Sequence, residues 1–189
     1  VETIRAGLAP YVAGRRVEEV VGGAPRMFRN NPGGFDEVGY VLSGATLSSV
    51  QRRGKFLWIP LGSENLRAGD PSLVIHLGMS GQVHWQTPEL ARPGRVKHEH
   101  MWLRLSDGSA VSFVDQRTFG HLTASSLIKR GSRLVPELMG HIAPDPFEDD
   151  FSITEVTGRG QRSGRAVKTL ILDQEVVSGI GNIYADEAL

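Results

Sequence analysis

The segment HEHMWLRLSDGSAVSFV, residues 98–114, predicts a β-hairpin and with it the class of fold. The Asp-Gly pair at its centre is typical of a tight turn between antiparallel strands. Side chains alternate between the two faces of a strand. In the first strand, one face holds Glu99, Met101, Leu103 and Leu105, and the other holds His98, His100, Trp102 and Arg104. We expect the first face to point into a core and the second toward solvent or a ligand.

Further short segments with the composition of strands surround this hairpin, separated by Gly, Pro and Asn. They are Val17–Val21, Leu47–Val50, Lys55–Ile59, Leu73–Leu77 and Gln82–Trp85. Helical segments do not alternate with them, which argues against βαβ units. The sequence therefore predicts an α+β fold that begins with an antiparallel β-sandwich with flanking helices over residues 1–130.

Both ends of the chain carry helical patterns. Val1, Ile4 and Leu8 share one face of a helix that Gly14 can close, and no cap residue precedes it. A second helix opens at Ile183 and has made only about two turns when it reaches Leu189. We expect both helices to belong to a longer protein. Simple fraying of the two ends is the alternative.

A change of composition follows Arg133. Pro136, Gly140, Pro144 and Pro146 lie close together and precede the acidic run at residues 148–150. Such a stretch is typical of a domain boundary, and we place a linker at residues 131–147. Beyond it the apolar period becomes helical, so residues 148–189 form a second, helical domain.

The composition of the 189 residues excludes several classes of protein. There is no cysteine, so within these residues a disulfide scaffold, a thiol nucleophile and a cysteine-ligated zinc are all excluded. No apolar run approaches the roughly 18 residues that span a bilayer. These features permit a reducing, cytoplasmic setting. Lys+Arg and Asp+Glu number 21 each, so a polyanionic partner requires the basic groups to gather on one surface.

Such a gathering is present near the C-terminal end. Four basic residues stand between Gly158 and Lys168 without an intervening acid, and they are Arg159, Arg162, Arg165 and Lys168. The glycine turn at Val176–Gly181 follows, and Asn182 stands where a helix cap is expected. Helix, glycine turn and helix predict a module that grips a nucleic-acid backbone. A solvated loop and a merely structural cap are the alternatives.

Single residues of the first domain also suggest chemistry. Lys55 stands at the mouth of the apolar strand FLWI, where loss of water favours a neutral amine that carries protons or forms an imine. Met79, Arg117 and Phe119 lie in glycine-containing loops, from which such side chains can enter a DNA duplex. The alternatives are a lysine that extends into solvent and a core position for Met79 and Phe119.

His98 and His100 are two positions apart on one strand and can face the same way. This spacing suggests a metal site and a metal-dependent hydrolase, but no third ligand stands at a defined spacing. A contact from His98 or His100 to a phosphate is the competing use of the same face.

Five motifs in order resemble the bacterial formamidopyrimidine-DNA glycosylase (Fpg) family. They are QRRGK at 51–55, IHLGMSG at 75–81, KHEH at 97–100, DQRTFG at 115–120, and LDQ at 172–174 with GIGNIYADE at 179–187. The resemblance implies a base-excision-repair enzyme that removes oxidised purines such as 8-oxoguanine and formamidopyrimidines, then nicks the strand by β,δ-elimination. It also implies a β-sandwich followed by the start of a helix-two-turn-helix domain at 148–189.

The same resemblance assigns residue roles. Lys55 matches the lysine of proton transfer, and Met79, Arg117 and Phe119 match the trio that fills the duplex when a base is flipped. The DNA-binding positions are His98, Arg117, Lys168 and Asn182. Ser163 stands where relatives often have a basic residue, so we expect Arg162 or Arg165 to take over that contact. The run RTFG distinguishes this branch from the endonuclease VIII branch.

The family's nucleophile is an N-terminal proline followed by a glutamate, just before the Val-Glu-Thr that begins this chain, and neither is among these residues. We therefore expect the 189 residues alone to bind DNA without full activity. The family's structural zinc finger would follow Leu189, so zinc is expected in the complete protein and no metal site in this chain. The implied partner is damaged double-stranded DNA, with no membrane and a monomeric protein. A non-enzymatic helix-two-turn-helix nucleic-acid-binding protein is the alternative.

Overall fold

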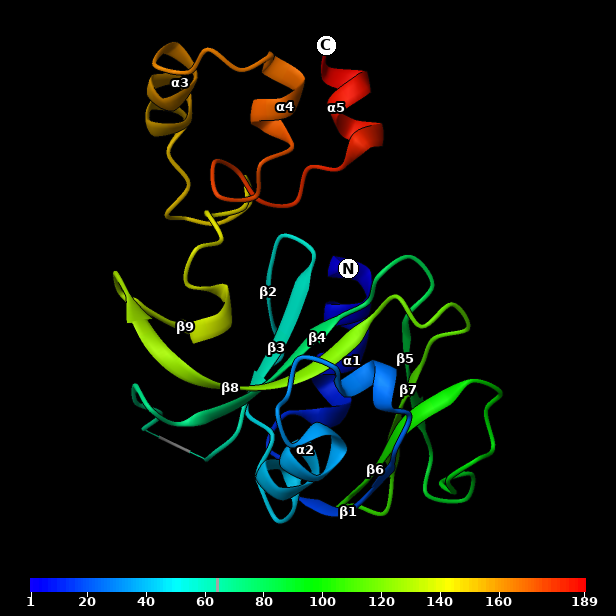
Figure 1. Ribbon diagram of the computed structural model, residues 1–189. Helices are drawn as coiled ribbons and strands as arrows, with labels where there is room; N and C mark the ends of the chain where they lie inside the picture. The colour runs from blue at the N-terminus through cyan, green and yellow to red at the C-terminus, as the bar shows by residue number, and fades with distance from the viewer. Residues whose placement is uncertain (64) are drawn as a thin grey trace. The chain divides into compact units, whose positions relative to one another are not determined.

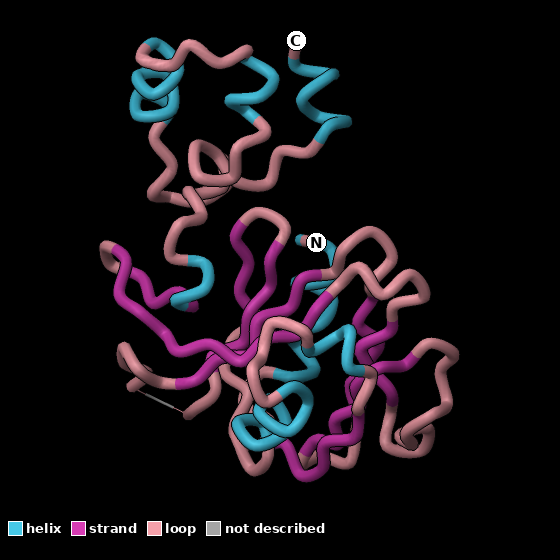
Figure 2. The backbone as a smooth tube through the Cα atoms, viewed as in Figure 1, coloured by secondary structure: helices cyan, strands magenta, loops and turns pink. Residues whose placement is uncertain are grey.

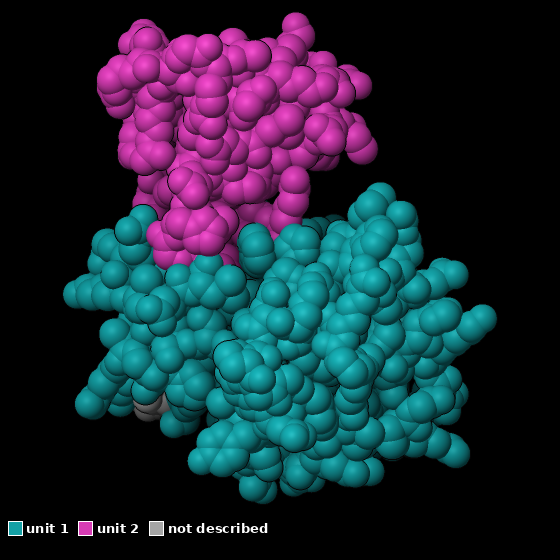
Figure 3. All heavy atoms as spheres, viewed as in Figure 1, with its two compact units in different colours: residues 1–52, 56–138 teal, residues 53–55, 139–189 magenta. Residues whose placement is uncertain are grey.

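The computed structural model describes residues 1–63 and 65–189. The chain divides into two compact units, which are described separately (Figure 3). Unit 1 comprises residues 1–52 and 56–138, and unit 2 comprises residues 53–55 and 139–189. The tip of one hairpin, Arg53–Lys55, thus belongs to unit 2 although the strands beside it are assigned mostly to unit 1.

Unit 1 is built on two antiparallel sheets (Figures 1 and 2). The four-stranded sheet has the order β1-β6-β7-β5, with bounds β1 Val17–Gly22, β6 Glu99–Leu105, β7 Ala110–Val114 and β5 Gln82–Gln86. The five-stranded sheet has the order β2-β3-β4-β8-β9, with bounds β2 Gln51–Arg53, β3 Phe56–Pro60, β4 Pro71–His76, β8 His121–Arg130 and β9 Arg133–Pro136. The α+β class and the antiparallel sheets predicted from the sequence are confirmed.

Helices contribute to the same unit. They are α1 Glu2–Val12, α2 Gly34–Leu42 and the 3-10 turn η1 Pro25–Phe28, while a further turn, η2 Glu137–Met139, follows β9. Each helix buries one apolar stripe, as Leu8 and Val12 do on α1 and Val38 and Leu42 do on α2. Gly14 follows α1 with a φ of +77°, a backbone conformation that glycine adopts without strain.

The core lies among residues that alternate along both sheets. In the 98–114 hairpin, Met101 pairs with Phe113 and Leu103 with Val111, and all four are buried. The same apolar cluster includes residues of the five-stranded sheet, namely Leu57, Ile59, Leu73, Ile75 and Leu122. Full burial of such a side chain contributes roughly 1.5–3 kcal/mol, so this cluster supplies much of the stabilisation of unit 1. The expected inward face of the hairpin is confirmed.

The second face of the same strand was expected to be open, and this was wrong for Trp102. Its side chain is 0% exposed, and the Arg104 guanidinium lies 5.3 Å from the centre of the indole ring. The strand is also irregular, because its register against β7 shifts between Glu99 and Met101. A bulge of this kind re-aims side chains, so strict alternation does not continue to the start of the strand.

Other differences from the sequence prediction are local. Leu47–Val50 is not a strand, since only Leu47 forms an isolated bridge, with Leu61, and the strand begins at Gln51. Helix α2 was not predicted, although Phe35, Val38 and Leu42 have helical spacing. Part of the stretch expected to be a linker is ordered as β9, where Val135 is buried and pairs with Ile128.

Unit 2 is helical apart from the hairpin tip. It contains α3 Ile153–Gln161, α4 Val167–Ile171 and α5 Asn182–Ala188, and its buried residues include Leu170, Val176, Val177 and Ala185. The Ser152 side chain caps α3 by accepting a hydrogen bond from the Glu155 amide at 3.2 Å. The expected cap of α5 was wrong by one position: Gly181 is the cap, and Asn182 is the first helical residue. Within the described residues, no helix is both long and apolar enough to span a bilayer.

Candidate nucleic-acid interface and active site

Two loops of unit 1 touch each other backbone to backbone. They are the turn after β4, which contains Gly78 and Met79, and the turn after β7, residues 115–120. A methyl group added at Gly78 would lie 2.7 Å from the Gly120 amide nitrogen, and one at Gly120 would lie 2.7 Å from the His76 carbonyl oxygen. Gly78 also has a φ of +60°. Gly78 of IHLGMSG and Gly120 of DQRTFG are therefore required because the backbone segments approach each other too closely for a side chain.

The buried carboxylate of Asp115 joins these two loops. Its Oδ1 accepts hydrogen bonds from the Ser80 hydroxyl at 2.6 Å and from the Arg117 amide at 3.1 Å. Its Oδ2 accepts from the Gly120 amide at 2.8 Å. One side chain thus binds the Met79 loop through Ser80 and both ends of the Arg117–Gly120 turn.

The environment of Asp115 keeps this carboxyl group ionised. Burial alone would raise its pKa, but the hydrogen bonds from Ser80 and from the Gly120 and Arg117 amides favour the charged form. The charge of nearby His100 acts in the same direction, and the net result is a lowered pKa. At neutral pH, Asp115 is therefore an acceptor at both oxygens.

The side chains that these loops carry point away from the core. Met79 is 73% exposed and Phe119 is 41% exposed, so the alternative of a core position is wrong for both. The Arg117 guanidinium lies 4.7 Å from the centre of the Phe119 ring, in a cation–π contact. Thr118, between them, has a φ of +54°, which is strained for a β-branched residue. Strain of this kind occurs at functional sites, where the surroundings impose it.

A second residue restrains the 115–120 turn from its carbonyl side. The guanidinium of Arg29, just after η1, donates to the Gly120 carbonyl at 2.8 Å and to the Phe119 carbonyl at 3.1 Å. Sequence reasoning missed Arg29, because 90 residues separate it from Phe119 and it belongs to no motif. The same guanidinium lies 3.4 Å from Nδ1 of His121.

The surroundings of His121 perturb its pKa strongly. Its ring stacks on His76 at a centroid distance of 5.0 Å. Burial, then the charges of His76 and Arg29, lower the pKa of His121 from 6.5 to about 4. The ring is therefore neutral at physiological pH.

This lowered pKa predicts a loss of stability in mild acid. Unfolded His121 takes up a proton below about pH 6.5, whereas the folded residue stays neutral down to about pH 4, so the free energy of unfolding falls as the pH falls through this window. The loss between pH 7 and pH 5 is at most ~2 kcal/mol, and partial exposure of the ring reduces it. Urea titrations at the two pH values should show His121→Gln with a smaller pH dependence than the parent. His141→Gln, at an exposed site, should leave it unchanged.

His98 and His100 do not form a metal site. His98 precedes β6 with a φ of +62°, and Nε2 of His100 lies 2.8 Å from the Asp115 carbonyl oxygen. His98 lies outside β6, and the register of that strand is irregular just after Glu99. Among residues 1–63 and 65–189, no group of three or more His, Cys, Asp or Glu could hold a metal ion. The alternative of a metal-dependent hydrolase has no support in this part of the chain.

Lys55 lies in unit 2 against the glycine turn that leads into α5. Its Nζ donates to the Ile180 carbonyl at 3.1 Å. A methyl group at Gly54 would lie 2.9 Å from the Gly179 amide nitrogen, and one at Gly181 would lie 3.0 Å from Nζ itself. The predicted lysine and the predicted glycine turn, 125 residues apart, are thus brought together within one unit.

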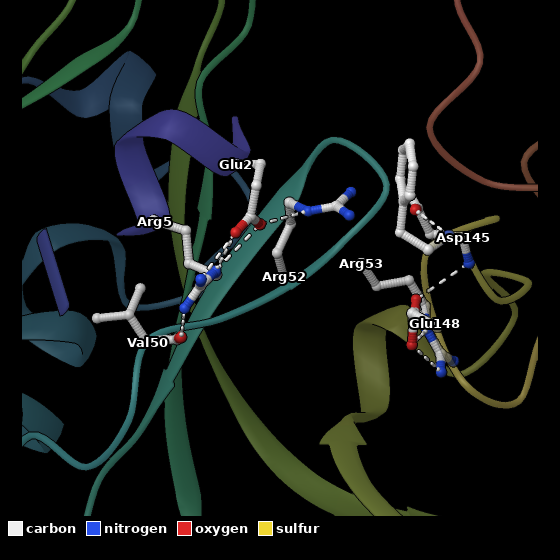
Figure 4. A network of polar contacts seen from close by, with 8 residues as sticks. Glu2, Arg5, Val50, Arg52, Arg53, Asp145 and Glu148 are labelled. Carbon is white, nitrogen blue, oxygen red and sulfur yellow. Dashed lines mark hydrogen bonds and ion pairs between the residues drawn. The ribbon is translucent and has the colours of Figure 1, made fainter. Parts of the chain in front are cut away.

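A buried ion pair fixes the residue two positions before Lys55 (Figure 4). Arg53 is 3% exposed, and its Nε and one terminal nitrogen donate to the Glu148 carboxylate at 2.8–3.1 Å. The other terminal nitrogen donates to the Ile142 carbonyl at 3.3 Å, and Glu148 in turn accepts from the Asp145 amide at 3.0 Å. Sequence reasoning interpreted the acidic run as part of a boundary and missed Glu148.

Arg52, the neighbour of Arg53, pairs with a residue of unit 1 (Figure 4). Its Nε donates to the Glu2 carboxylate at 2.9 Å, and Glu2 also pairs with Arg5 at 2.7 Å. The hydrogen bond from Arg5 is the main reason that the pKa of Glu2 is lowered. This network ties the start of α1 to β2.

The basic residues of unit 2 have acidic partners nearby. Arg165 pairs with Asp173 at 2.7 Å, Arg159 pairs with Glu155 at 2.9 Å, and Lys168 pairs with Asp186. The hydrogen bond from Arg165 lowers the pKa of Asp173. Arg162 and Asn182 are exposed. The absence of acids within residues 158–168 therefore did not mean that these basic residues lack acidic partners, because the acids come from segments before and after this stretch.

Comparison with protein families matches both units to one family. Residues 1–122 match the model of the formamidopyrimidine-DNA glycosylase N-terminal domain, and residues 142–189 match that of the formamidopyrimidine-DNA glycosylase H2TH domain. The chain is 42% identical over 195 residues to a formamidopyrimidine-DNA glycosylase of Nocardia farcinica and 44% identical over 193 residues to one of Salinispora arenicola.

These alignments cover 100% of this chain but 64% and 62% of the two relatives. The chain therefore spans somewhat less than two thirds of the length of the curated relatives that it matches.

Solved structures are similar over the same extent. A complex of Lactococcus lactis Fpg with DNA containing Fapy-dG has a TM-score of 0.77 and 29% identity, with 100% of this chain and 65% of that chain covered. A complex of the same bacterium's Fpg with DNA containing an abasic site has a TM-score of 0.76 and 29% identity, with 100% and 64% covered. The backbone of the present chain thus follows that of proteins solved on damaged DNA.

Proposed function

Because the chain belongs to the formamidopyrimidine-DNA glycosylase family, we propose that it is part of a bifunctional DNA glycosylase and abasic-site lyase. The complete enzyme flips out and removes oxidised purines, 8-oxoguanine and formamidopyrimidine, and nicks the strand by β,δ-elimination. The observation that carries this proposal concerns the turns after β4 and β7, here called the loop pair. These two turns expose Met79 and Phe119, and the buried carboxylate of Asp115 holds them together. A protein that only binds a nucleic-acid backbone has no need of exposed apolar side chains held in this way.

In this proposal Met79, Arg117 and Phe119 enter the duplex where a base leaves the stack. Unstacking a base costs a few kcal/mol, and apolar or planar side chains that take its place offset that cost. Arg117 can donate a hydrogen bond to the base that is left without a partner. Its cation–π contact with Phe119 holds the two side chains next to each other. His98 contacts the DNA backbone from the start of β6.

Unit 2 is proposed to hold the DNA and to contribute a proton carrier. Lys55 moves a proton during elimination, which fits an amine that lies within hydrogen-bond distance of a backbone carbonyl. Arg162, Arg165, Lys168 and Asn182 contact phosphates. For Arg165 and Lys168, a phosphate would replace Asp173 and Asp186 as the acidic partner.

The domain roles and the setting follow from the same proposal. Residues 1–130 form the catalytic domain, 131–147 a connection and 148–189 the beginning of the DNA-binding domain. We propose a structural zinc for the complete protein, as in the family that the chain resembles. The residues of this chain do not fit a zinc site: they include no cysteine, and the described ones contain no cluster of three ligands. We further propose a monomer that acts on the bacterial nucleoid in the cytoplasm, since its substrate is duplex DNA.

The experiment that tests the proposed function compares two duplexes. One contains a tetrahydrofuran analogue of an abasic site, and the other is undamaged with the same sequence. The chain should bind the first more tightly, because the missing base leaves a gap for the loop pair at no unstacking cost. Equal affinity for the two duplexes would favour the alternative, a non-enzymatic helix-two-turn-helix binder.

Substitution of the phosphate-contacting residues should weaken binding to damaged and undamaged duplexes equally. Lys168→Ala and Asn182→Ala should lower the affinity for both duplexes by the same factor, because phosphate contacts carry no sequence information. Lys168→Ala should also lower the slope of log K against log salt concentration by about one unit. Fluorescence anisotropy at several salt concentrations measures both quantities. A change in preference for damage with intact affinity for undamaged DNA would contradict the phosphate role.

Truncation of the exposed apolar residues Met79 and Phe119 should leave the stability of the fold unchanged and impair base flipping. Met79→Ala and Phe119→Ala should change the free energy of unfolding by no more than about 0.5 kcal/mol, because both side chains are solvent-exposed. Both should remove most of the preference for the abasic analogue. Phe113→Ala, in the core, is the contrasting variant and should cost about 3–5 kcal/mol of stability. Large destabilisation by the Met79 or Phe119 change with normal preference would refute the duplex-filling role.

A further inference from the structure

The loop pair of unit 1 is restrained at its backbone on two opposite sides. Asp115 accepts from the amides at both ends of the Arg117–Gly120 turn, and Arg29 donates to the carbonyls of its last two residues. The hydroxyl of Ser80 joins the Met79 loop to the same carboxylate. The side chains of Met79, Arg117 and Phe119, by contrast, are exposed.

This arrangement separates two tasks. Met79, Arg117 and Phe119 are exposed and free to enter another molecule, whereas the groups that hold their backbones are Asp115, which is buried, and Arg29. The strained φ of Thr118 requires such restraint, since a free turn would relax to an unstrained conformation. Side chains held before binding lose less conformational freedom when they bind.

We propose that Asp115 and Arg29 are positioning residues that hold the Met79 and Arg117–Phe119 loops in the conformation that enters the duplex. This inference rests on the proposed function, since it concerns how the same loops extrude a base. In this proposal the rate of base extrusion depends on the Asp115 carboxylate and the Arg29 guanidinium, although neither group needs to touch the DNA.

Asp115→Asn is the sharpest variant, because it keeps the shape of the side chain. An amide has one acceptor oxygen and one NH2 group, whereas the Asp115 site presents donors to both oxygens. In either orientation of the amide, the NH2 group faces a donor of the Arg117–Gly120 turn, either the Gly120 amide or the Arg117 amide, and the acceptor oxygen that remains for the other amide carries no charge. Arg29→Met is the second variant, since it removes both carbonyl contacts of the turn without touching the carboxylate site.

The matched control is Asp107→Asn. Asp107 is a turn aspartate of the same unit that accepts from the Ser109 amide at 3.0 Å, the Ser109 hydroxyl at 2.6 Å and Arg15 at 2.9 Å. It lies in the β6–β7 turn and contacts neither loop of the pair. The same chemical change is thus made in a similar hydrogen-bond setting.

Two measurements on the 189-residue chain test the proposal. Hydrogen exchange in the free protein reports on the Arg117 and Gly120 amides, and stopped-flow fluorescence of 2-aminopurine beside an 8-oxoguanine reports base extrusion. Asp115→Asn should speed exchange at both amides and slow extrusion, each by about tenfold or more, because hydrogen bonds to a charged acceptor are the stronger ones. Affinity for undamaged duplex should remain that of the parent. Arg29→Met should change exchange and extrusion in the same directions, and Asp107→Asn should change neither.

The outcomes separate this proposal from the function on which it rests. Parent-like exchange, or faster exchange with parent-like extrusion, in both Asp115→Asn and Arg29→Met would overturn the positioning role. If the parent chain itself extrudes no base, the proposed function fails, and exchange at the Arg117 and Gly120 amides still decides whether Asp115 holds the loops. Should Asp115→Asn not fold, Arg29→Met alone decides by the same two measurements.

Discussion

Glu148→Gln should destabilise unit 2 by about 3–5 kcal/mol, the cost of leaving a buried charge without its partner. Arg53 is 3% exposed and loses its pairing with the buried Glu148 carboxylate, and glutamine offers one acceptor oxygen in place of two to the guanidinium and the Asp145 amide. Thermal unfolding and hydrogen exchange of the amides of α4 and α5 measure the effect. Exchange is the more specific measurement, because it reports on unit 2 separately from the sheets of unit 1.

Asp150→Asn is the control for this prediction. Asp150 also pairs with Arg53, at 3.3 Å, but its side chain is 47% exposed. Exposed ion pairs contribute about 0–1 kcal/mol, so its loss should be small. Equal effects of the two variants would mean that burial of the Arg53–Glu148 pair does not stabilise unit 2.

Lys55→Met should reduce strand cleavage at an abasic site by about 10²–10⁴-fold, the usual contribution of a positioned proton-transfer group. The protein to use is this chain joined to the segments of the Nocardia farcinica relative that lie outside the matched 64% of its length. Methionine keeps the length and apolar stem of the side chain, so the contact surface near Gly181 is preserved. Gel assays on a duplex with a true abasic site measure cleavage, and anisotropy with the tetrahydrofuran duplex should show nearly unchanged binding.

Lys129→Met provides the matched control for Lys55. Lys129 is an exposed lysine of β8, in a stretch of that strand that pairs with β9. Its substitution should leave cleavage at the level of the flanked parent. Cleavage by Lys55→Met at that same level would show that another group transfers the proton.

The sequence predicted the sheets well where the apolar pattern is local. The 98–114 hairpin was predicted from alternation and an Asp-Gly turn, both of which lie within 17 consecutive residues. The bulge at Glu99 and the burial of Trp102 were missed, because both depend on the neighbouring strand and on what covers the second face. Helix α2 has a helical pattern that could have been found, but its nine residues stand among glycines.

The site was predictable only in part, and for the same reason. Motif residues such as Met79, Phe119 and Lys55 were identified, since their neighbours in sequence are glycines or apolar strands. Arg29 and Glu148 were not, because each acts on a segment about 90 residues away. The cap of α5 at Gly181 instead of Asn182 shows the limit of local rules at element ends.

The glycines at positions 78 and 120 have a consequence for how this chain can change over generations. A methyl group at Gly78 would lie 2.7 Å from main-chain atoms of Phe119 and Gly120, and one at Gly120 would lie 2.7 Å from the His76 carbonyl oxygen at the end of β4. A crowded side chain can be relieved by shortening its neighbour, but every amino acid has the same main chain. No single replacement elsewhere can therefore make room for alanine at either position. In a selection for suppressors of Gly78→Ala, we expect true reversion or a change in loop length. The sequences of the two loops should therefore change together or stay unchanged together.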